Sequence, residues 1–168
     1  INGNNIIEDG ILPCLARAAT ENDLGANFDE TQDIWRSMEY VVDKTSIEKM
    51  EDRYRIVVDY KPYEDIAQIS LTYDIYADGT ISIREKMTDA GNIAAAFMLP
   101  RFGIGMSLNG AFSNLEYFGL GPHENYADRC SSASMGRYCN RVEDMYHYGY
   151  VRPQESGTRT QLKWIAVT

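Results

Sequence analysis

Apolar and polar residues alternate along the middle of the chain with a period of two. In residues 68–76 (QISLTYDIY) one side of the alternation is apolar throughout. Its members are Ile69, Leu71, Tyr73 and Ile75. Residues 53–62 and 80–87 follow the same pattern. A period of two is that of a β-strand with one buried and one solvated face, so these runs predict an antiparallel sheet.

The tripeptide Ala77-Asp78-Gly79 separates two of these runs. Asp-Gly between alternating runs is a strong hairpin signal, because both residues tolerate a positive φ. We therefore predict that the runs on either side form a β-hairpin. Residues 94–108 hold two short apolar runs, and further strand candidates lie in residues 114–121, 135–139 and 160–167.

Only one stretch has the period of a helix, and it is short. Thr31 is a suitable N-cap and Asp33 suits a first helical turn. Three apolar side chains then share one face: Ile34, Trp35 and Met38. This pattern predicts one short helix near residues 31–40. We expect the first thirty residues, in which Gly, Asn and Asp recur, to be irregular.

No repeat, low-complexity tract or linker interrupts the chain, which at 168 residues suits one domain. We therefore predict a single all-β domain over residues 1–168. The chain holds 16 basic and 25 acidic residues, a net charge of −9. This balance argues against nucleic acid and against an anionic membrane as partners. No apolar run approaches the roughly 20 residues that span a bilayer.

The beginning of the sequence, INGNNIIEDG, has no initiating methionine and no visible signal peptide. It resembles the start of an excised piece, so a cytoplasmic and a periplasmic origin both stay open. Three cysteines cannot all pair with one another, and no CxxC signature is present. We expect Cys14, Cys130 and Cys139 to be buried or half-buried free thiols.

Residues 117–129 (YFGLGPHENYADR) concentrate polar groups that suit either an active site or a structured loop. A metal site is disfavoured, because His123 and Glu124 are adjacent and His147 is the only other histidine. No G-x-S-x-G nucleophile signature is present. The residues favour a loop in which Asn125 holds backbone amides and Arg129 pairs with an acid.

Tyrosine is unusually frequent, with twelve in the chain. Four of them lie close together in sequence: Tyr138, Tyr146, Tyr148 and Tyr150. Their flat amphipathic rings suit the faces of sugars, and they suit a domain interface equally well.

Three ordered stretches resemble the C-terminal "small chain" domain of glycoside hydrolase family two β-galactosidases. Residues 118–129 (FGLGPHENYADR) resemble the family segment G-x-GP-x-ENY-x-DR. Residues 17–25 (RAATENDLG) resemble RAP-x-DND-x-G, and residues 150–164 resemble Y-x-x-PQENGNR-x-x-x-W. The match covers essentially the whole chain. It departs at Ala19 and Ala127, where the family has proline, and at residues 156–159, which read SGTR in place of NGNR.

The resemblance implies a large antiparallel β-sandwich, a supersandwich of the galactose-mutarotase-like type. It also implies a parent enzyme that hydrolyses terminal β-galactosides with retention. In that family both catalytic glutamates lie on a separate TIM barrel, and Mg and Na are commonly used there. The expected partners are therefore this barrel and the galactoside substrate. No catalytic residue, metal ligand or cofactor of the family carries over to a position in this chain.

The motif residues of this chain are instead expected to make interdomain or carbohydrate contacts. They are Arg17, Asn22, Asp23, Glu124, Asn125, Tyr126, Arg129, Arg152 and Glu155. Arg129 and Arg152 lie beside Asp128 and Glu155, and we expect both arginines to be buried ion-pair partners.

Two other hypotheses stay open at this point. In one, the chain is a stand-alone carbohydrate-binding module. In the other, it is a mutarotase-like epimerase, for which the only histidine candidates lie outside any such motif. The family places further strands before Ile1 and after Thr168, so residues 160–168 are expected to expose an apolar edge. We expect this edge to support a homo-oligomer, most simply a symmetric dimer.

Overall fold

The structure of the chain is a computed structural model, which describes residues 5–28, 33–61, 66–91, 98–152 and 154–168. The chain divides into two compact units. Unit 1 comprises Ile1–Asp9, Ala18–Ala26 and Ser107–Thr168, and unit 2 comprises Gly10–Arg17 and Asn27–Met106. Each unit is described by itself below. The single domain over residues 1–168 stays a prediction.

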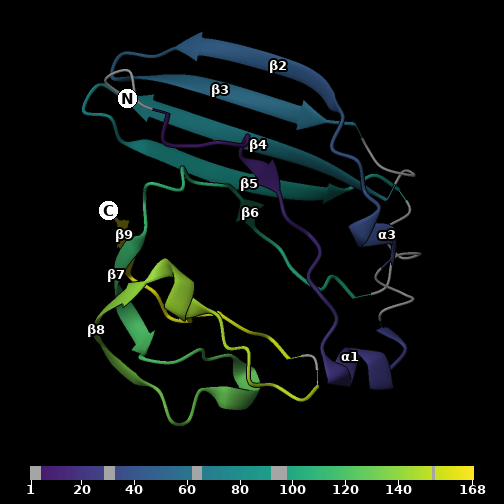
Figure 1. Cartoon of the computed structure of the whole chain (residues 1–168). Helices are drawn as coiled ribbons and strands as arrows, with labels where there is room; N and C mark the ends of the chain where they lie inside the picture. Colours follow the sequence, from purple (N-terminus) through teal and green to yellow (C-terminus); the bar gives the residue numbers. More distant parts are fainter. Residues whose placement is uncertain (1–4, 29–32, 62–65, 92–97, 153) are drawn as a thin grey trace. The chain divides into compact units, whose positions relative to one another are not determined.

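Unit 2 is built on a four-stranded antiparallel sheet with the order β2-β3-β4-β5 (Figure 1). Its strands are β2 (Val42–Lys49), β3 (Arg53–Tyr60), β4 (Ala67–Tyr76) and β5 (Ile81–Asp89). The predicted hairpin is confirmed, because β4 pairs with β5 in antiparallel register from Ile75 opposite Ile81. Strands β3, β4 and β5 lie where the period of two placed them.

The hairpin turn differs from the expectation in one respect. Gly79 has a φ of 88°, whereas Asp78 is not among the residues with positive φ. The Asp78 carboxylate instead accepts a hydrogen bond of 2.8 Å from the Thr80 backbone N–H. Only the glycine therefore needs the left-handed region, and the aspartate stabilises the turn through its side chain.

The core of unit 2 lies against the apolar face of β4. Ile69 and Leu71 are buried there together with Leu15 and Trp35. Trp35 belongs to α3 (Asp33–Arg36), which is shorter than the predicted helix; the proposed N-cap, Thr31, lies outside the described residues. The predicted apolar face is confirmed, since Ile34, Trp35 and Met38 all contribute to this core.

Two short strands and one long strand of unit 2 were not predicted. β1 (Leu12–Pro13) pairs with β6 (Ile104–Gly105). β6 lies within the apolar runs of residues 94–108, of which residues 94–97 lie outside the described residues. Strand β2 is exposed along its whole length as the edge of the sheet. An edge strand with no buried face carries no alternation to detect.

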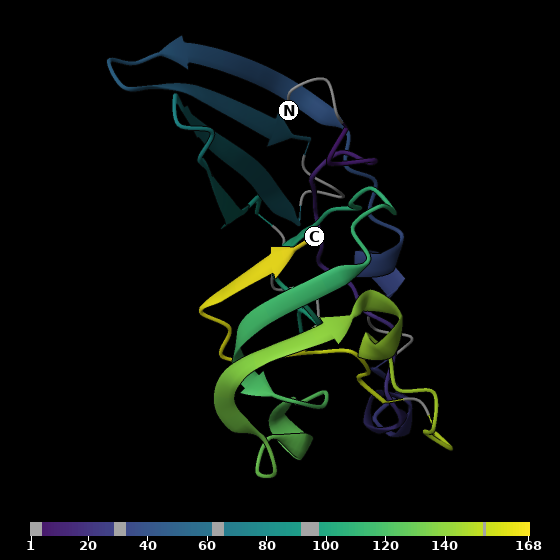
Figure 2. The ribbon, with the colours of Figure 1, turned by 60° about the vertical axis from the view of Figure 1, so that its left-hand side comes forward.

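Unit 1 contains a three-stranded antiparallel sheet in which β7 lies between β8 and β9 (Figure 2). The strands are β7 (Asn114–Gly121), β8 (Ser134–Arg141) and β9 (Trp164–Val167). All three fall within predicted runs or extend them slightly. The 3₁₀ helices η2 (Ala127–Arg129) and η3 (Val142–Met145) follow β7 and β8.

A second α-helix, α1 (Glu21–Gly25), lies in the segment that was expected to be irregular. It begins with a capping box: the Thr20 hydroxyl accepts from the Asp23 backbone N–H, and the Asp23 carboxylate accepts from the Thr20 backbone N–H. This reciprocal pair satisfies two backbone donors at the helix start. The described residues thus form antiparallel sheets with few and short helices, which confirms the all-β fold class.

The three cysteines are free, but only Cys14 is half-buried; Cys130 and Cys139 are exposed. The expectation of buried thiols was wrong for these two. Cys139 lies on β8, whose burial pattern leaves alternate residues exposed. Among the described residues, no helix is both long enough and apolar enough to span a membrane.

Replacing Gly79 by alanine should lower the free energy of unfolding by about 1 kcal/mol, because a Cβ is disfavoured at this positive φ. Urea unfolding followed by circular dichroism measures the change. Gly110→Ala is the matched control, since Gly110 has no positive φ and a Cβ added there would meet open space. Equal effects of the two substitutions would contradict the strained turn.

Candidate functional site

The polar loop of residues 122–126 leaves the end of β7 through a cis peptide bond between Gly121 and Pro122. Tyr117, fully buried on β7, donates from its hydroxyl to the Pro122 carbonyl at 3.2 Å. The same hydroxyl accepts from Arg159 Nε at 3.1 Å. Tyr117 on β7 therefore fixes the position of Pro122, the first residue of the loop.

Asn125 is fully buried and its side-chain amide is hydrogen-bonded at both ends. Its Nδ2 donates to the carbonyls of Leu120 and His123, at 2.9 and 3.0 Å. Its Oδ1 accepts from the backbone N–H and the hydroxyl of Thr160, at 2.9 and 2.6 Å. The Asn125 backbone N–H donates to the Thr158 carbonyl. A side chain paired in this way joins two backbone segments and offers nothing to a ligand.

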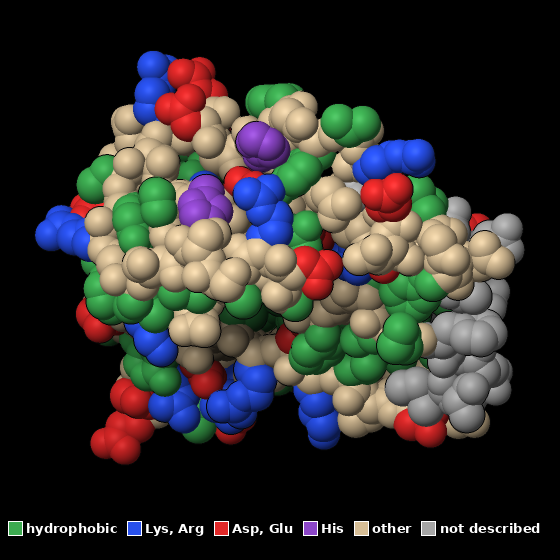
Figure 3. All heavy atoms as spheres, turned by 90° about the horizontal axis from the view of Figure 1, so that it is seen from below, with side chains coloured by type: hydrophobic (Ala, Val, Ile, Leu, Met, Phe, Trp, Pro, Cys, Tyr) green, Lys and Arg blue, Asp and Glu red, His purple; other side chains and the backbone are tan. Residues whose placement is uncertain are grey.

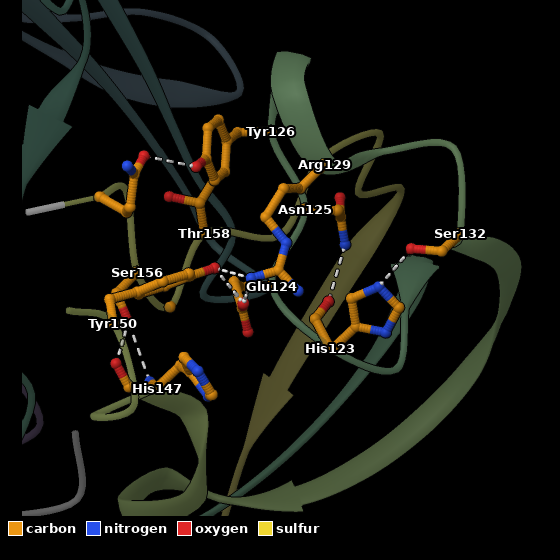
Figure 4. Close-up of polar contacts among 12 residues, drawn as sticks. His123, Glu124, Asn125, Tyr126, Arg129, Ser132, His147, Tyr150, Ser156 and Thr158 are labelled. Atoms are coloured by element: carbon orange, nitrogen blue, oxygen red, sulfur yellow. Dashed lines mark hydrogen bonds and ion pairs between the residues drawn. The ribbon is translucent and has the colours of Figure 1, made fainter. Parts of the chain in front are cut away.

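Glu124 is a buried carboxylate, 5% exposed, with two partners on one oxygen. Arg129 Nη1 lies 2.9 Å from Glu124 Oε1, and the Tyr150 hydroxyl donates to the same oxygen at 2.5 Å. Arg129 also donates to the Tyr150 hydroxyl, and its guanidinium lies 5.2 Å from the centre of the Tyr150 ring. Figure 4 shows the three side chains converging from separate segments.

The ionisation of this group follows from its contacts. Burial acts to raise the pKa of Glu124, but hydrogen bonds from Tyr150 and the backbone and the charge of Arg129 outweigh it, so the pKa is lowered. Burial and the hydrogen bond to Glu124 raise the pKa of Tyr150. At neutral pH the site therefore holds a carboxylate and a protonated phenol.

A second layer of contacts surrounds this group. The Tyr126 hydroxyl donates to Gln154 Oε1 at 3.0 Å, and the Thr158 hydroxyl donates to Glu155 Oε1 at 2.7 Å. The Ser156 hydroxyl binds the backbone of His147 on both sides: it accepts from the N–H at 2.9 Å and donates to the carbonyl at 3.1 Å. The Tyr126–Gln154 bond therefore joins the loop to Gln154, and the two Ser156–His147 bonds join residues nine positions apart after η3.

The expected contact residues are distributed unevenly. Glu124, Asn125, Tyr126 and Arg129 form the connected group described above, and Glu155 lies in the segment beside it. Of the residues around α1, Asp23 caps its own helix, while the exposed Asn22 reaches Asp128 with its amide nitrogen at 3.4 Å. Arg17 is half-buried and belongs to unit 2.

The expected pairing of Arg129 with an acid is confirmed, but neither Arg129 nor Arg152 is buried: their side chains are 39% and 70% exposed. Arg129 pairs with Glu124 rather than with its neighbour Asp128. Arg152 pairs with Glu21, at 3.5 Å, and its side chain is 70% exposed, so it is not a buried ion-pair partner. Arg129 and Asp128 are neighbours in η2, and the tertiary fold brings Glu124 rather than Asp128 to the guanidinium. Sequence reasoning also missed Tyr150 as a partner of Glu124, although it had noted the cluster of tyrosines.

The tyrosine cluster lines an open hollow of about 430 Å³, which we call the tyrosine hollow. The residues that line it are Ala18, Ala19, Tyr146, His147, Tyr148, Tyr150, Val151, Arg152 and Gln154. Tyr138 is not among them; its ring packs on Tyr117 instead. Figure 3 shows both histidines of the chain at the surface, with arginine and acidic side chains near them on the same face.

Metal coordination was the alternative for His123. The His123 Nε2 atom lies 3.0 Å from the Ser132 hydroxyl. Across the part of the chain that the structure describes, no three His, Cys, Asp or Glu side chains are grouped so that they could hold a metal ion.

Comparisons with known proteins match nearly the whole chain to one group of proteins, the β-galactosidases. A family model described as "Beta galactosidase small chain" matches residues 1–168. A β-galactosidase of Priestia megaterium is 32% identical over 165 residues, which are 97% of this chain and 16% of that protein. β-Galactosidases of Halalkalibacterium halodurans and Vibrio cholerae are 29% and 28% identical, over 98% and 99% of this chain. The chain spans only 16% and 17% of those two proteins.

Arg129→Ala should lower the free energy of unfolding by about 1–3 kcal/mol, because it leaves the buried Glu124 carboxylate without its cation. Arg152→Ala should change it by less than about 0.5 kcal/mol, since that ion pair is exposed. Chemical unfolding of the two variants side by side measures the difference. A solvated loop would instead give two equal and small effects.

The stability that Glu124 contributes should depend on pH. Its pKa is lower in the folded state, so the contribution is complete above the ordinary carboxyl pKa of about 4.3 and is lost as the pH falls toward the folded-state pKa. The difference in unfolding free energy between the native chain and Glu124→Gln should therefore shrink from pH 7 to acidic pH. Tyr150→Phe removes one hydrogen bond that lowers the pKa of Glu124. In a chain with this substitution, the effect of Glu124→Gln on the unfolding free energy should therefore change less with pH. A difference that is constant with pH would contradict the assigned charge.

Proposed function

We propose, since this chain belongs to the beta galactosidase small chain family, that it is an accessory part of a β-galactosidase that hydrolyses terminal non-reducing β-D-galactosides. The observation that carries the proposal is the match of the family model to all 168 residues. The names of the relatives support the same activity for the longer protein of which this chain is a part. The chain itself contributes no catalytic residue in this proposal.

The chemistry of the polar loop supports a structural and interdomain role. A catalytic carboxylate must reach its substrate, whereas the Glu124 side chain is 6% exposed and is bound to Arg129 and Tyr150. Asn125 is likewise paired at both ends of its amide. These contacts hold the loop in one conformation, which is what a surface needs in order to dock against the catalytic barrel of the longer protein.

Several finer assignments belong to the same proposal. The sheets are part of a galactose-mutarotase-like supersandwich, the parent is a glycoside hydrolase of family two, and its acid/base and nucleophile are glutamates of a TIM barrel. We assign any Mg and Na of the parent to that barrel, because the described side chains of this chain form no group suited to a metal. The parent is a homo-oligomer, and the exposed Trp164 and Ile165 of β9 suit a strand-edge contact.

A stand-alone carbohydrate-binding module is the second candidate function. The exposed rings of Tyr146 and Tyr148, which are 54% and 83% accessible, favour it. The two candidates differ in a simple way. An accessory part is needed by a longer enzyme, whereas a module binds sugar without one.

The proposal is tested in the longer protein expressed from the complete reading frame. That protein should hydrolyse a nitrophenyl β-galactoside, and this chain alone should not. In the longer protein, Glu124→Gln should lower the melting temperature while kcat stays within about threefold, because Glu124 does not touch the reacting atoms. Tyr54→Phe, a conservative change at an exposed residue of β3, is the control for non-specific loss. A folded Glu124→Gln enzyme whose kcat falls about a thousandfold would overturn the accessory role.

A further inference from the structure

We infer that the tyrosine hollow is a binding site for a neutral pyranoside, specifically a β-galactoside. The choice of galactose among neutral sugars rests on the proposed function, whereas the choice of a neutral ring rests on the lining of the hollow. Its volume of about 430 Å³ falls within the range of small-molecule sites, about 300–1,000 Å³.

Two exposed tyrosine rings contribute apolar surface to the hollow, beside Ala18, Ala19 and Val151. Tyr148 is 83% exposed and Tyr146 is 54% exposed, and their ring centres lie 4.6 Å apart at an angle of 56°. Both rings belong to unit 1, in the segment after η3. A tyrosine ring combines a flat apolar face with a polar hydroxyl, and so matches the alternating C–H and hydroxyl edges of a pyranose.

The inner wall of the hollow is rigid. The Tyr150 hydroxyl is bound to Glu124 and Arg129, and the guanidinium of Arg129 lies over the Tyr150 ring. The centres of the His147 and Tyr150 rings lie 4.6 Å apart, and the rings meet edge to face. The Ser156 hydroxyl is hydrogen-bonded to the His147 backbone. A wall that is already ordered loses little conformational entropy when a ligand binds.

Hydrogen-bond donors are available at the rim. Gln154 Oε1 accepts from Tyr126, which orients the amide. Among the described residues, Gln154 Nε2 has no acceptor, so both of its N–H groups remain for a ligand. A Cβ added at Gly149 would lie 2.9 Å from His147 Nε2, so the glycine makes room for the imidazole beside the hollow. Sugar hydroxyls accept from groups of this kind.

The charges around the hollow are compensated within the chain. Glu124 is paired with Arg129 beneath Tyr150, and Arg152 is paired with Glu21 at the rim. The described residues that line the hollow include no carboxylate, and their one guanidinium, that of Arg152, is ion-paired. This balance favours a neutral ligand over an anion or a cation.

The test is a titration of the 168-residue chain with lactose, followed by calorimetry and by chemical shifts of the tyrosine rings. We expect saturable binding in the millimolar range. Tyr148→Ala should weaken it about tenfold, because it removes a stacking surface. Tyr54→Ala is the matched control: Tyr54 is also exposed, at 49%, but lies on β3 of unit 2, and its loss should leave binding unchanged.

A second variant examines the polar rim. Gln154→Glu keeps an acceptor for the Tyr126 hydroxyl but removes the amide donors, and should weaken lactose binding about fivefold or more. Unchanged melting temperatures would exclude unfolding as the cause. Binding that is absent, unaffected by Tyr148→Ala, or stronger for galacturonate than for galactose would overturn the inference.

A domain interface would give a different result from a sugar site. If the hollow is covered by another part of the longer protein, Tyr148→Ala should lower the melting temperature of that protein while the chain binds no lactose, and the inference fails. Hydrolysis by the longer protein tests the proposed function separately. An active enzyme whose small-chain piece does not bind lactose keeps that function and rejects only the sugar site.

Discussion

The buried carboxylate of Glu124 is the constraint on which the polar part of unit 1 depends. A charge removed from water must be paired, or the folded state loses several kcal/mol. Its partners, Arg129 and Tyr150, come from η2 and from the segment after η3. Three stretches of backbone outside the sheet therefore have to meet at one oxygen atom. This requirement fixes the loop after β7 and, through Tyr150, the inner wall of the tyrosine hollow.

The family motifs gain a physical meaning from the same region. They appear as three separate signals in the sequence, but their residues form one connected set of contacts. Asn22 on α1 reaches Asp128, and Asn125 holds Thr160 through both the backbone and the hydroxyl. Gly121 is required because a Cβ there would clash with the Tyr117 hydroxyl and lie 2.7 Å from the Tyr138 ring. The polar residues of the three motifs thus hold the loops of unit 1 together. This role explains why these polar side chains are paired inside the protein and are not exposed to a substrate.

Period-two patterns predicted the strands that have one buried face, and they failed where burial is absent. β4 and β7 alternate because one side of each packs on a core, as Leu71 and Tyr117 do. β2 is an exposed edge, so its sequence carries no such record. α1 was missed because its signal is a capping box rather than an apolar face; its only buried member is Asp23.

Polar partners were harder to predict than strands, for a physical reason. An apolar residue is satisfied by any apolar surroundings, so its pattern along the chain is informative. A buried charge needs a particular partner, and that partner is selected by tertiary geometry: Tyr150 lies 26 positions from Glu124, while the adjacent Asp128 is not used by Arg129. The composition of the loop therefore indicated that ion pairing would occur, and only the fold determined which residues pair. The same distinction separates a structural role from a binding role in this region. Side chains that pair with one another inside the protein stabilise the fold, whereas the exposed tyrosine rings beside them are accessible to a ligand.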